Sequence, residues 1–449
     1  MDKFNKKRIF DGFPIFFILV ICFIYSTGQF TDTYIRHDDW EFMTHLLPNM
    51  NHHGTPWDKT LWEGRWINFL WSYQAKELSI NANYIIFILG YSLFSWVYSS
   101  FLVKEYVYIK NDIFIKVIIS LMIFFCPTYA DLSLWPATLS PSVWIAFVGV
   151  LYCIYKEYWL GKVILFITLV MSYAPLAPAC LLLIVSCQNQ SFLNVFRTII
   201  LYISSYLLGV LIIYTLNYKF HGVFGVQIQD WRNPNPLVSF QTFIDNFHKS
   251  LGIWESIFYR NRYLLSFCVL ATSFNIYLNR KNRNIINVWV GVLCVFIFEF
   301  LISLYSGVDL PDRAIIWLWM FFVIIVSNSL FFMLNFNYLG KLYYVIPLFF
   351  IFYGANSWNE FYTSESKFAK IENNLLNLLS LQPRKDVFIC GDIGKLVGTG
   401  VTRDINAISL SFLKRQNIVL HSEEVAECNY VPNHLGVYDV NGITILKLN

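Results

Sequence analysis

The stretch Ile285-Ile-Asn-Val-Trp-Val-Gly-Val-Leu-Cys-Val-Phe-Ile-Phe-Glu-Phe-Leu-Ile-Ser-Leu-Tyr305 decides the fold of this chain. Only one of its residues, Glu299, is charged. About 20 consecutive apolar residues in a helix span the hydrocarbon core of a bilayer. The stretch therefore predicts a membrane-spanning helix that carries a single buried acid.

Similar apolar runs lie on both sides of this stretch. The chain is 56% hydrophobic and only 14% charged, a balance that soluble proteins of this length do not have. The small net charge of +4 gives no reason to invoke nucleic acid. We therefore predict a polytopic α-helical membrane protein with about eleven transmembrane helices. The other ten runs are 13–30, 82–103, 112–126, 137–155, 162–174, 177–190, 198–216, 262–279, 313–334 and 341–356.

Two regions of the chain, 13–30 and 162–190, allow more than one interpretation of the topology. Residues 13–30 are predicted as a retained anchor, because no clear cleavage site leads into a soluble domain. Residues 162–190 are broken by Pro175 and Pro178. They are predicted as two short helices, with one kinked helix as the alternative.

The distribution of basic residues predicts the orientation. Cytoplasmic loops carry an excess of Lys and Arg. Eleven helices with a cytoplasmic N-terminus put all four basic clusters inside, whereas one kinked helix at 162–190 would export residues 280–283. The outer segments are then 31–81, 127–136, 217–261, 306–312 and the tail from about 357. The basic clusters are Lys3, Lys6, Lys7 and Arg8; Lys104, Lys110 and Lys116; Lys156 and Lys162; and Arg280, Lys281 and Arg283.

The chain divides into a membrane domain, 1–356, and a small periplasmic α/β domain, 357–449. A helical pattern at 365–381 precedes strands at 387–390, 417–420 and 443–448, and Asp439–Gly442 predicts a hairpin turn. Cys390 and Cys428 could pair if the tail is exported, with two free thiols as the alternative. No Cys or His spacing indicates a structural zinc.

The leading candidate site is Asp38-Asp39, which follows the first helix closely and lies beside Arg36, His37 and Trp40. One Asp can act as a general base while the other orients the substrate or the base. Adjacent acids repel, which tends to raise one pKa. The alternative is that the two residues cap a helix at the membrane surface.

Two arginines at outer helix ends are candidate phosphate ligands. Arg65 lies in Glu63-Gly-Arg-Trp66, and a guanidinium binds phosphate oxygens in a fork while an indole packs on a sugar. Arg313 follows Asp312 at another outer helix entrance. The alternatives are an aromatic belt with a snorkelling Arg65 and a turn capped by Asp312.

The remaining candidates are individual acids and aromatic residues. Trp40, Trp66, Glu63 and Asp131 are predicted contacts to sugar or acceptor, with helix capping as the alternative for Asp131. Glu299 either lines the same cavity or makes a buried hydrogen bond.

An enzyme whose catalytic carboxylates lie on the outer face has no access to nucleotide-sugars, because these are cytoplasmic. A sugar donor must arrive already activated, and a polyprenyl phosphate in the membrane is the usual carrier. Transfer from it needs a base for the acceptor hydroxyl, cations for the departing phosphate and aromatic surfaces for sugar. The outer segments supply all three.

Asp38-Asp39-Trp40 followed by Glu63-Gly-Arg65-Trp66, together with many helices and a soluble tail, resembles the GT-C glycosyltransferases. Within that class it is similar to the Gtr-type glucosyltransferases that cause serotype conversion by glucosylation of bacterial O-antigen. The resemblance implies undecaprenyl-phosphate glucose as donor, lipid-linked O-antigen of lipopolysaccharide as acceptor and the bacterial inner membrane as location. Arginines can neutralise the phosphate, so no metal is required, although two acids leave a divalent cation possible.

Two other functions stay open. An O-antigen polymerase or ligase is also polytopic and periplasmic, but would rely on arginines in large outer loops. A lipid-linked sugar transporter or flippase would show repeated halves and charges near mid-membrane. Only Glu299 meets the second condition, and no repeat is present.

Overall fold

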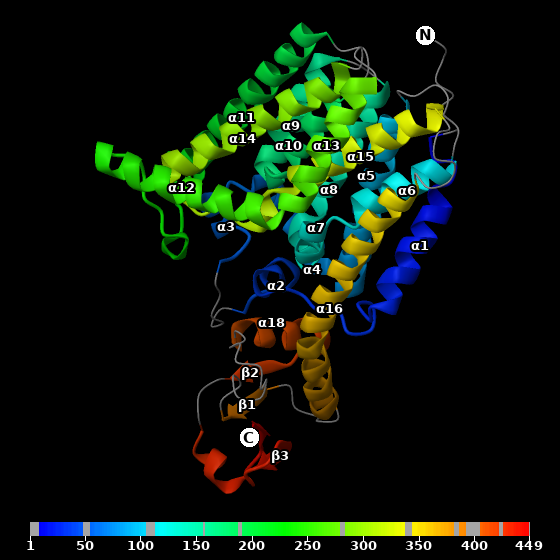
Figure 1. Ribbon diagram of the computed structural model, residues 1–449. Helices are drawn as coiled ribbons and strands as arrows, with labels where there is room; N and C mark the ends of the chain where they lie inside the picture. The colour runs from blue at the N-terminus through cyan, green and yellow to red at the C-terminus, as the bar shows by residue number, and fades with distance from the viewer. Residues whose placement is uncertain are drawn as a thin grey trace.

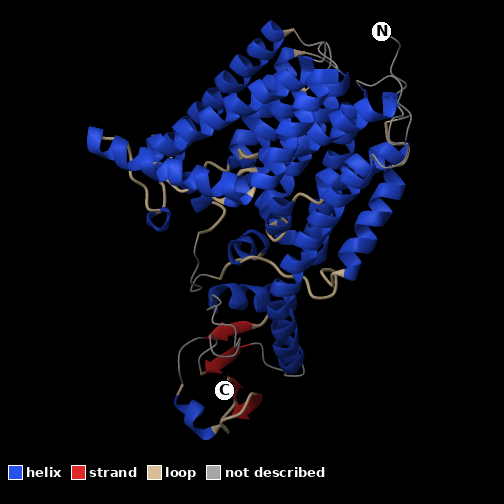
Figure 2. Cartoon of the chain, viewed as in Figure 1, coloured by secondary structure: helices blue, strands red, loops and turns tan. Residues whose placement is uncertain are grey.

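The computed structural model is built almost entirely of helices, with one small sheet near the C-terminus (Figures 1 and 2). It describes residues 9–47, 54–104, 113–155, 158–186, 191–278, 283–336, 344–380, 386–391, 405–421 and 425–448. Within these ranges, four helical stretches are long and apolar enough to cross a membrane: Ile80–Val103, Pro136–Cys153, Phe192–His221 and Asn284–Ser306.

In their described residues, all eleven apolar runs form helices, which confirms a mostly helical chain. The count of eleven membrane crossings stays a prediction, because only four of the described helical stretches are long and apolar enough to cross a membrane. The four long stretches belong to α5 (Ile80–Lys104), α8 (Pro136–Tyr155), α11 (Phe192–His221) and α14 (Arg283–Ser306). The other runs form α1 (Phe13–Ser26), α6 (Ile113–Phe124), α9 (Trp159–Tyr173), α10 (Leu176–Val185), α13 (Arg262–Leu278), α15 (Ile316–Phe336) and the start of α16 (Val345–Ser380).

The segment 162–190 forms two helices rather than one kinked rod. Gly161 near the start of α9 lies against Tyr152 of α8. Cys180 of α10 lies within electrostatic reach of Cys153, which follows Tyr152 directly in α8. A straight helix would hold residues 161 and 180 about 28 Å apart. The chain therefore runs out along α9 and returns along α10, which confirms the two-helix interpretation.

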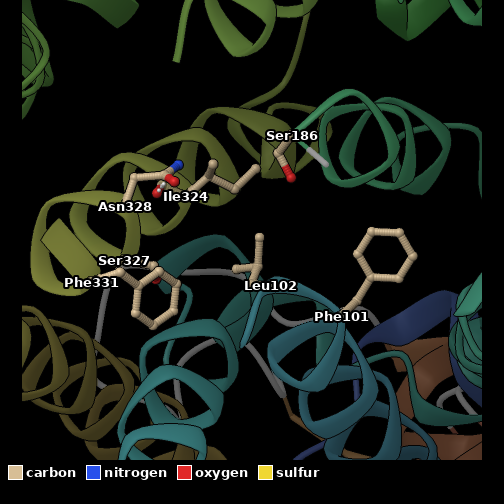
Figure 3. Close-up of a pocket in the computed structure, with 7 residues that line it drawn as sticks. All are labelled: Phe101, Leu102, Ser186, Ile324, Ser327, Asn328 and Phe331. Carbon is tan, nitrogen blue, oxygen red and sulfur yellow. Dashed lines mark hydrogen bonds between the residues drawn. The ribbon is translucent and has the colours of Figure 1, made fainter. Parts of the chain in front are cut away.

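The end of α10 shows the same return. Ser186, its C-cap, lies beside Phe101 and Leu102 at the last turn of α5 and beside Ile324 of α15 (Figure 3). These residues surround a cavity of about 10 Å³, enough for about one water molecule.

The two ends of the helical bundle differ. Figure 1 shows the N-terminus at one end and the C-terminal domain at the other. The second end, here called the site end, also carries short helices from the predicted outer segments: α2 (His37–Met43), α3 (Asp58–Glu63), α4 (Trp66–Glu77) and α7 (Pro127–Leu132). Much of the predicted basic clusters, including residues 3–8, 110, 156 and 280–281, lies outside the described residues.

The C-terminal sheet has the strand order β2-β1-β4-β3. β1 (Asp386–Cys390) pairs in parallel with β2 (Val419–His421) and β4 (Ile443–Lys447), and β3 (Gly436–Val440) pairs antiparallel with β4. Asn441 and Gly442 both have positive φ, as a two-residue type I′ hairpin requires. The three predicted strands and the hairpin turn are confirmed. Sequence reasoning missed β3 and α18 (Ile405–Gln416).

Two features of the tail bear on its role. Cys390 and Cys428 form a disulfide, so the paired alternative is confirmed. The predicted boundary at 356/357 falls inside α16, which runs without a break through the predicted span and the predicted tail helix. Its sequence turns polar there, but no proline interrupts it, and polarity alone does not end a helix. One helix therefore belongs to both domains.

Candidate active site

Asp39 joins the short helix α2 to the bundle. Its side chain is fully buried and accepts hydrogen bonds from the backbone N–H groups of Ala137 (2.9 Å) and Thr138 (2.7 Å), at the start of α8. Such a carboxylate satisfies donors that the first helical turn leaves unpaired. Burial raises the pKa of Asp39 to about 7, although these hydrogen bonds act to lower it. Asp39 therefore caps α8 and fixes the direction of α2.

Asp38 faces a different environment. One carboxylate oxygen lies 2.8 Å from Nε2 of His37, and the other lies 3.1 Å from Nζ of Lys59. Its side chain is 26% exposed. Burial acts to raise the pKa of Asp38, but the hydrogen bond from His37 and the charge of Lys59 hold it well below its ordinary value. Of the two adjacent acids, Asp38 is the ionised and accessible one.

Glu63 is the centre of a group of cations. Its carboxylate lies 2.8 Å from Nε of Arg65, 2.5 Å from Nη2 of Arg232 and 3.8 Å from Nζ of Lys59. Burial acts to raise the pKa of Glu63, but Arg65, Lys59 and Arg232 lower it. This placement argues against the predicted sugar contact, because the buried carboxylate is already surrounded by positive charge.

A second set of charges lies around the indole of Trp135. Arg36 and Arg313 stand over this ring, 5.5 Å and 5.1 Å from its centre. Arg36 also lies 3.4 Å from Asp131 and 3.7 Å from Glu365 of α16. Burial raises the pKa of Asp131, although Arg36 and Arg313 act against it. The structure places Asp131 beside Arg36 as its ion-pair partner, and the predicted contact to sugar stays a prediction.

The two sets meet at Tyr173. Arg65 stands over the Tyr173 ring, 5.7 Å from its centre, and the Tyr173 hydroxyl donates to the backbone carbonyl of Arg313 (3.0 Å). The structure therefore brings the two predicted phosphate ligands, Arg65 and Arg313, to one place. Within the described part of the chain, Arg313 makes no ion pair, so its charge is available to a ligand.

We call this assembly the charge cluster. It combines five cations with four carboxylates, which leaves one positive charge uncompensated. Such an excess in a half-buried site favours a singly charged anion such as a phosphodiester. Its members are Arg36, Lys59, Arg65, Arg232, Arg313, Asp38, Glu63, Asp131 and Glu365, with Trp135 and Tyr173.

Three predicted residues lie elsewhere. Trp40 is fully buried in a core formed by α2, α4, α8 and α18, with Arg415 over its ring. Trp66 packs α4 against α11, and its Nε1 donates to Asn217 (2.9 Å). Glu299 accepts a hydrogen bond from Trp317 (2.8 Å). These placements favour packing roles for both tryptophans and the hydrogen-bonding alternative for Glu299.

Sequence reasoning gave no role to five members of the cluster, namely Lys59, Arg232, Glu365, Trp135 and Tyr173. Lys59 had a signal, since it precedes Glu63 by four residues and therefore shares a helix face with it. Arg232, Trp135 and Tyr173 come from three separate segments, and no local pattern links them to Asp38.

Two cavities lie at the site end, and no member of the charge cluster is among the residues that line them. One of about 270 Å³ is lined by His45, Trp57, Phe69, Tyr73 and other residues of α4 and its surroundings. One of about 470 Å³ lies between α16 and α18. Among the described residues, no group of three or more His, Cys, Asp or Glu side chains is placed to share a metal ion.

Comparison of the chain with models of protein families, with curated proteins and with solved structures finds no match. The charge cluster lies at the end of a bundle of apolar helices, and it holds together a carboxylate and several cations. These are the groups that proton abstraction from a hydroxyl and phosphate binding require.

Proposed function

We propose that this chain is a membrane glycosyltransferase of the GT-C type. It moves a sugar, glucose by the resemblance to the Gtr-type enzymes, from undecaprenyl phosphate to a hydroxyl group of lipid-linked O-antigen. The reaction takes place on the periplasmic face of the bacterial inner membrane. The observation that carries this proposal is the position of Asp38 between Lys59 and His37 at the edge of the charge cluster.

The proposed topology has eleven crossings and places the site end outside the cytoplasm. The basic clusters of the sequence favour the cytoplasm for the opposite end. The Cys390–Cys428 disulfide supports an oxidising compartment for the tail. Several of the eleven helices are short: α10 has 10 residues and is therefore about 15 Å long. A helix of that length crosses only where the bilayer thins around it.

In the proposed reaction, the Asp38 carboxylate accepts the proton of the acceptor hydroxyl. The hydroxyl oxygen then bonds to the anomeric carbon of the donor sugar while the bond from that carbon to the phosphate oxygen breaks. The electron pair of this bond leaves with the polyprenyl phosphate. Arg313 and Arg65 stabilise the growing negative charge on the phosphate. If the donor linkage is β and the product α, this single displacement inverts the configuration.

The test is O-antigen modification in cells that carry Asp38→Asn, Asp39→Asn or the double variant. We expect Asp38→Asn to abolish side-branch glucosylation while the protein remains inserted at its normal level. Full modification by Asp38→Asn in properly inserted protein would overturn the assignment of the base.

The same experiment separates the alternatives. Loss of a side branch indicates a glucosyltransferase, whereas collapse of chain length indicates a polymerase or ligase. Transport of the lipid-linked sugar in proteoliposomes, without a covalent product, would indicate a flippase. The early acidic residue in a cluster of cations favours transfer over both.

A further inference from the structure

The second long outer segment presents apolar side chains to its surroundings. Residues 223–260, here called the interfacial arm, contain a loop and the helix α12 (Phe240–Arg260). Figure 1 shows α12 projecting sideways from the bundle. In the loop and at the start of α12, Trp231, Val238 and Phe240 are 64%, 82% and 77% exposed. Exposed apolar side chains that gather in one place mark an interaction surface.

α12 has three distinct faces. One face packs on α14 through Asn246, Ser250, Trp254 and Ile257. A second face is apolar and exposed, and a third is polar. Phe240, Phe247, Leu251 and Phe258 fall on the exposed apolar face, whereas Asp245, His248, Lys249 and Glu255 fall on the polar face. A helix with this pattern and low overall hydrophobicity lies in the plane of a membrane surface.

The apolar face continues the outer surface of the bundle. The arm is pinned to the end of α14 by two backbone hydrogen bonds, from Asn235 N–H to Ser306 C=O (3.1 Å) and from Leu237 N–H to Tyr305 C=O (3.0 Å). Beside this attachment, α14 exposes Leu301 and Tyr305 on its outer flank. The helices α11 and α14 are among those that can cross a membrane. The arm therefore lies where their apolar surface ends.

The arm also reaches into the charge cluster. Arg232 of its loop binds Glu63 (2.5 Å), and Gln227 N–H donates to Leu61 C=O (3.1 Å). The neighbour of Arg232, the exposed Trp231, lies on the outside, with the Arg232 guanidinium 4.9 Å from its ring centre. One short stretch thus joins the exposed apolar surface to the cations of the site.

We propose that the interfacial arm is embedded in the outer leaflet of the membrane and forms the side from which a lipid-borne phosphodiester reaches the charge cluster. The exposed apolar face of α12 is covered by lipid acyl chains. Arg232 stands at the crossing between lipid and site and receives the phosphate first. The role in delivery rests on the proposed function, whereas the depth of the arm in the membrane does not.

The first experiment measures the depth of the arm. A single cysteine replaces Phe240 or, on the opposite face, Asp245, in full-length protein whose other free thiols are removed. Each is labelled with an environment-sensitive fluorophore in vesicles of phosphatidylethanolamine and phosphatidylglycerol. We expect a blue-shifted emission, quenched by brominated lipid, at position 240 and not at position 245.

Equal emission and equal quenching at the two positions would overturn the proposal. So would a shift at position 240 that depends on the ratio of protein to lipid, because a second copy of the chain would then cover the face.

The second experiment tests delivery. We expect Val238→Ser with Phe240→Ser to reduce the transfer rate from the long-chain donor on the order of tenfold. Transfer from a water-soluble, short-chain analogue of the same donor is expected to stay unchanged. Asp245→Asn is the matched control and changes neither rate. Equal losses with both donors would overturn the role in delivery. If the wild-type protein transfers sugar from neither donor, the proposed function fails, and the depth measurement still decides the position of the arm.

Discussion

The two long segments that are predicted to lie outside the cytoplasm are both rich in aromatic residues, yet their aromatic side chains lie in opposite environments. In the first, 31–81, Trp40 is fully buried under α18. In the second, the interfacial arm, Phe240 is 77% exposed. The first segment builds the site, and the second faces outward. Aromatic content alone therefore does not tell whether an outer segment forms part of a core or a surface.

The length of the helices explains the difference. α2 has only seven residues and is enclosed by α4, α8 and α18, so its apolar side chains and two of its three acids, Asp39 and Glu41, are buried. α12 has 21 residues, and its apolar side chains recur on one side over the whole length. A long helix with one apolar face can lie on a surface. In a short, enclosed helix, by contrast, the polar side chains must find their hydrogen-bond partners within the protein.

The largest effect that we expect distinguishes an acid of each segment. Asp38→Asn removes the carboxylate that faces the cluster and lowers the transfer rate by about 10²- to 10⁴-fold. Asp245→Asn, on the polar face of α12, leaves the rate unchanged. The measurement is sugar transfer in membranes that contain equal amounts of each variant. Equal transfer rates for the two variants would contradict the assignment of Asp38 as the base.

The next effect concerns stability. Trp40→Ala opens a cavity between α2 and α18 and lowers the free energy of unfolding by about 3–5 kcal/mol. Phe240→Ala removes an exposed ring and changes it by about 0.5 kcal/mol or less in detergent. Thermal unfolding of the purified variants measures both. A Trp40→Ala variant as stable as Phe240→Ala would contradict the packing role of Trp40.

The sequence predicts the parts of this structure that depend on local pattern. Apolar runs long enough to cross a bilayer identify the helices, including the pair broken at Pro175. Alternation and Asn441-Gly442 identify the strands and the hairpin. The local patterns also single out Asp38, Arg65 and Arg313, which the structure brings into one charge cluster, while their roles stay predictions. Each of these signals lies within a few residues of chain.

Sequence reasoning fails where a role depends on contacts between distant segments. Asp38 and Asp39 are adjacent, and only the N–H groups of Ala137 and Thr138 make Asp39 a helix cap. The cations around Glu63 come from positions as distant as 232. The packing of Trp40 likewise depends on α18, which follows some 365 residues later in the chain.

A pH dependence should separate the two adjacent acids. An unfolded Asp has a pKa of about 3.9, whereas burial raises that of Asp39 to about 7. Between these values the folded protein binds more protons than the unfolded one, so Asp39 lowers the stability as the pH rises from about 4 to about 7. Above about 7 its contribution is constant. The folded pKa of Asp38 lies below the unfolded value, so Asp38 adds no slope in this range.

Asp39→Asn removes this dependence of the stability on pH. The dependence amounts to about 1.4 kcal/mol for each unit by which the folded and unfolded pKa values of Asp39 differ. We expect the stability difference between wild type and variant to change from about pH 4 to about pH 7, and the difference for Asp38→Asn to stay constant. Melting temperatures in detergent at several pH values measure this. A constant difference for Asp39→Asn would show that its carboxylate is ionised throughout, as a helix cap in a well-hydrated site would be.

The smallest effect tests the ion pair between Arg232 of the interfacial arm and Glu63 of segment 31–81. A double-mutant cycle with Glu63→Gln and Arg232→Gln should give a coupling energy of about 1–3 kcal/mol. The control pair, Arg260 and Asp312, is about half exposed, and its coupling should be about 1 kcal/mol or less. Within the first cycle, Glu63→Gln should cost more than Arg232→Gln, because it also removes the carboxylate that pairs with Arg65. Equal couplings for the two pairs, or equal losses in the two single variants, would mean that Glu63 does not hold the cluster together and that the arm is attached to the site by its backbone alone.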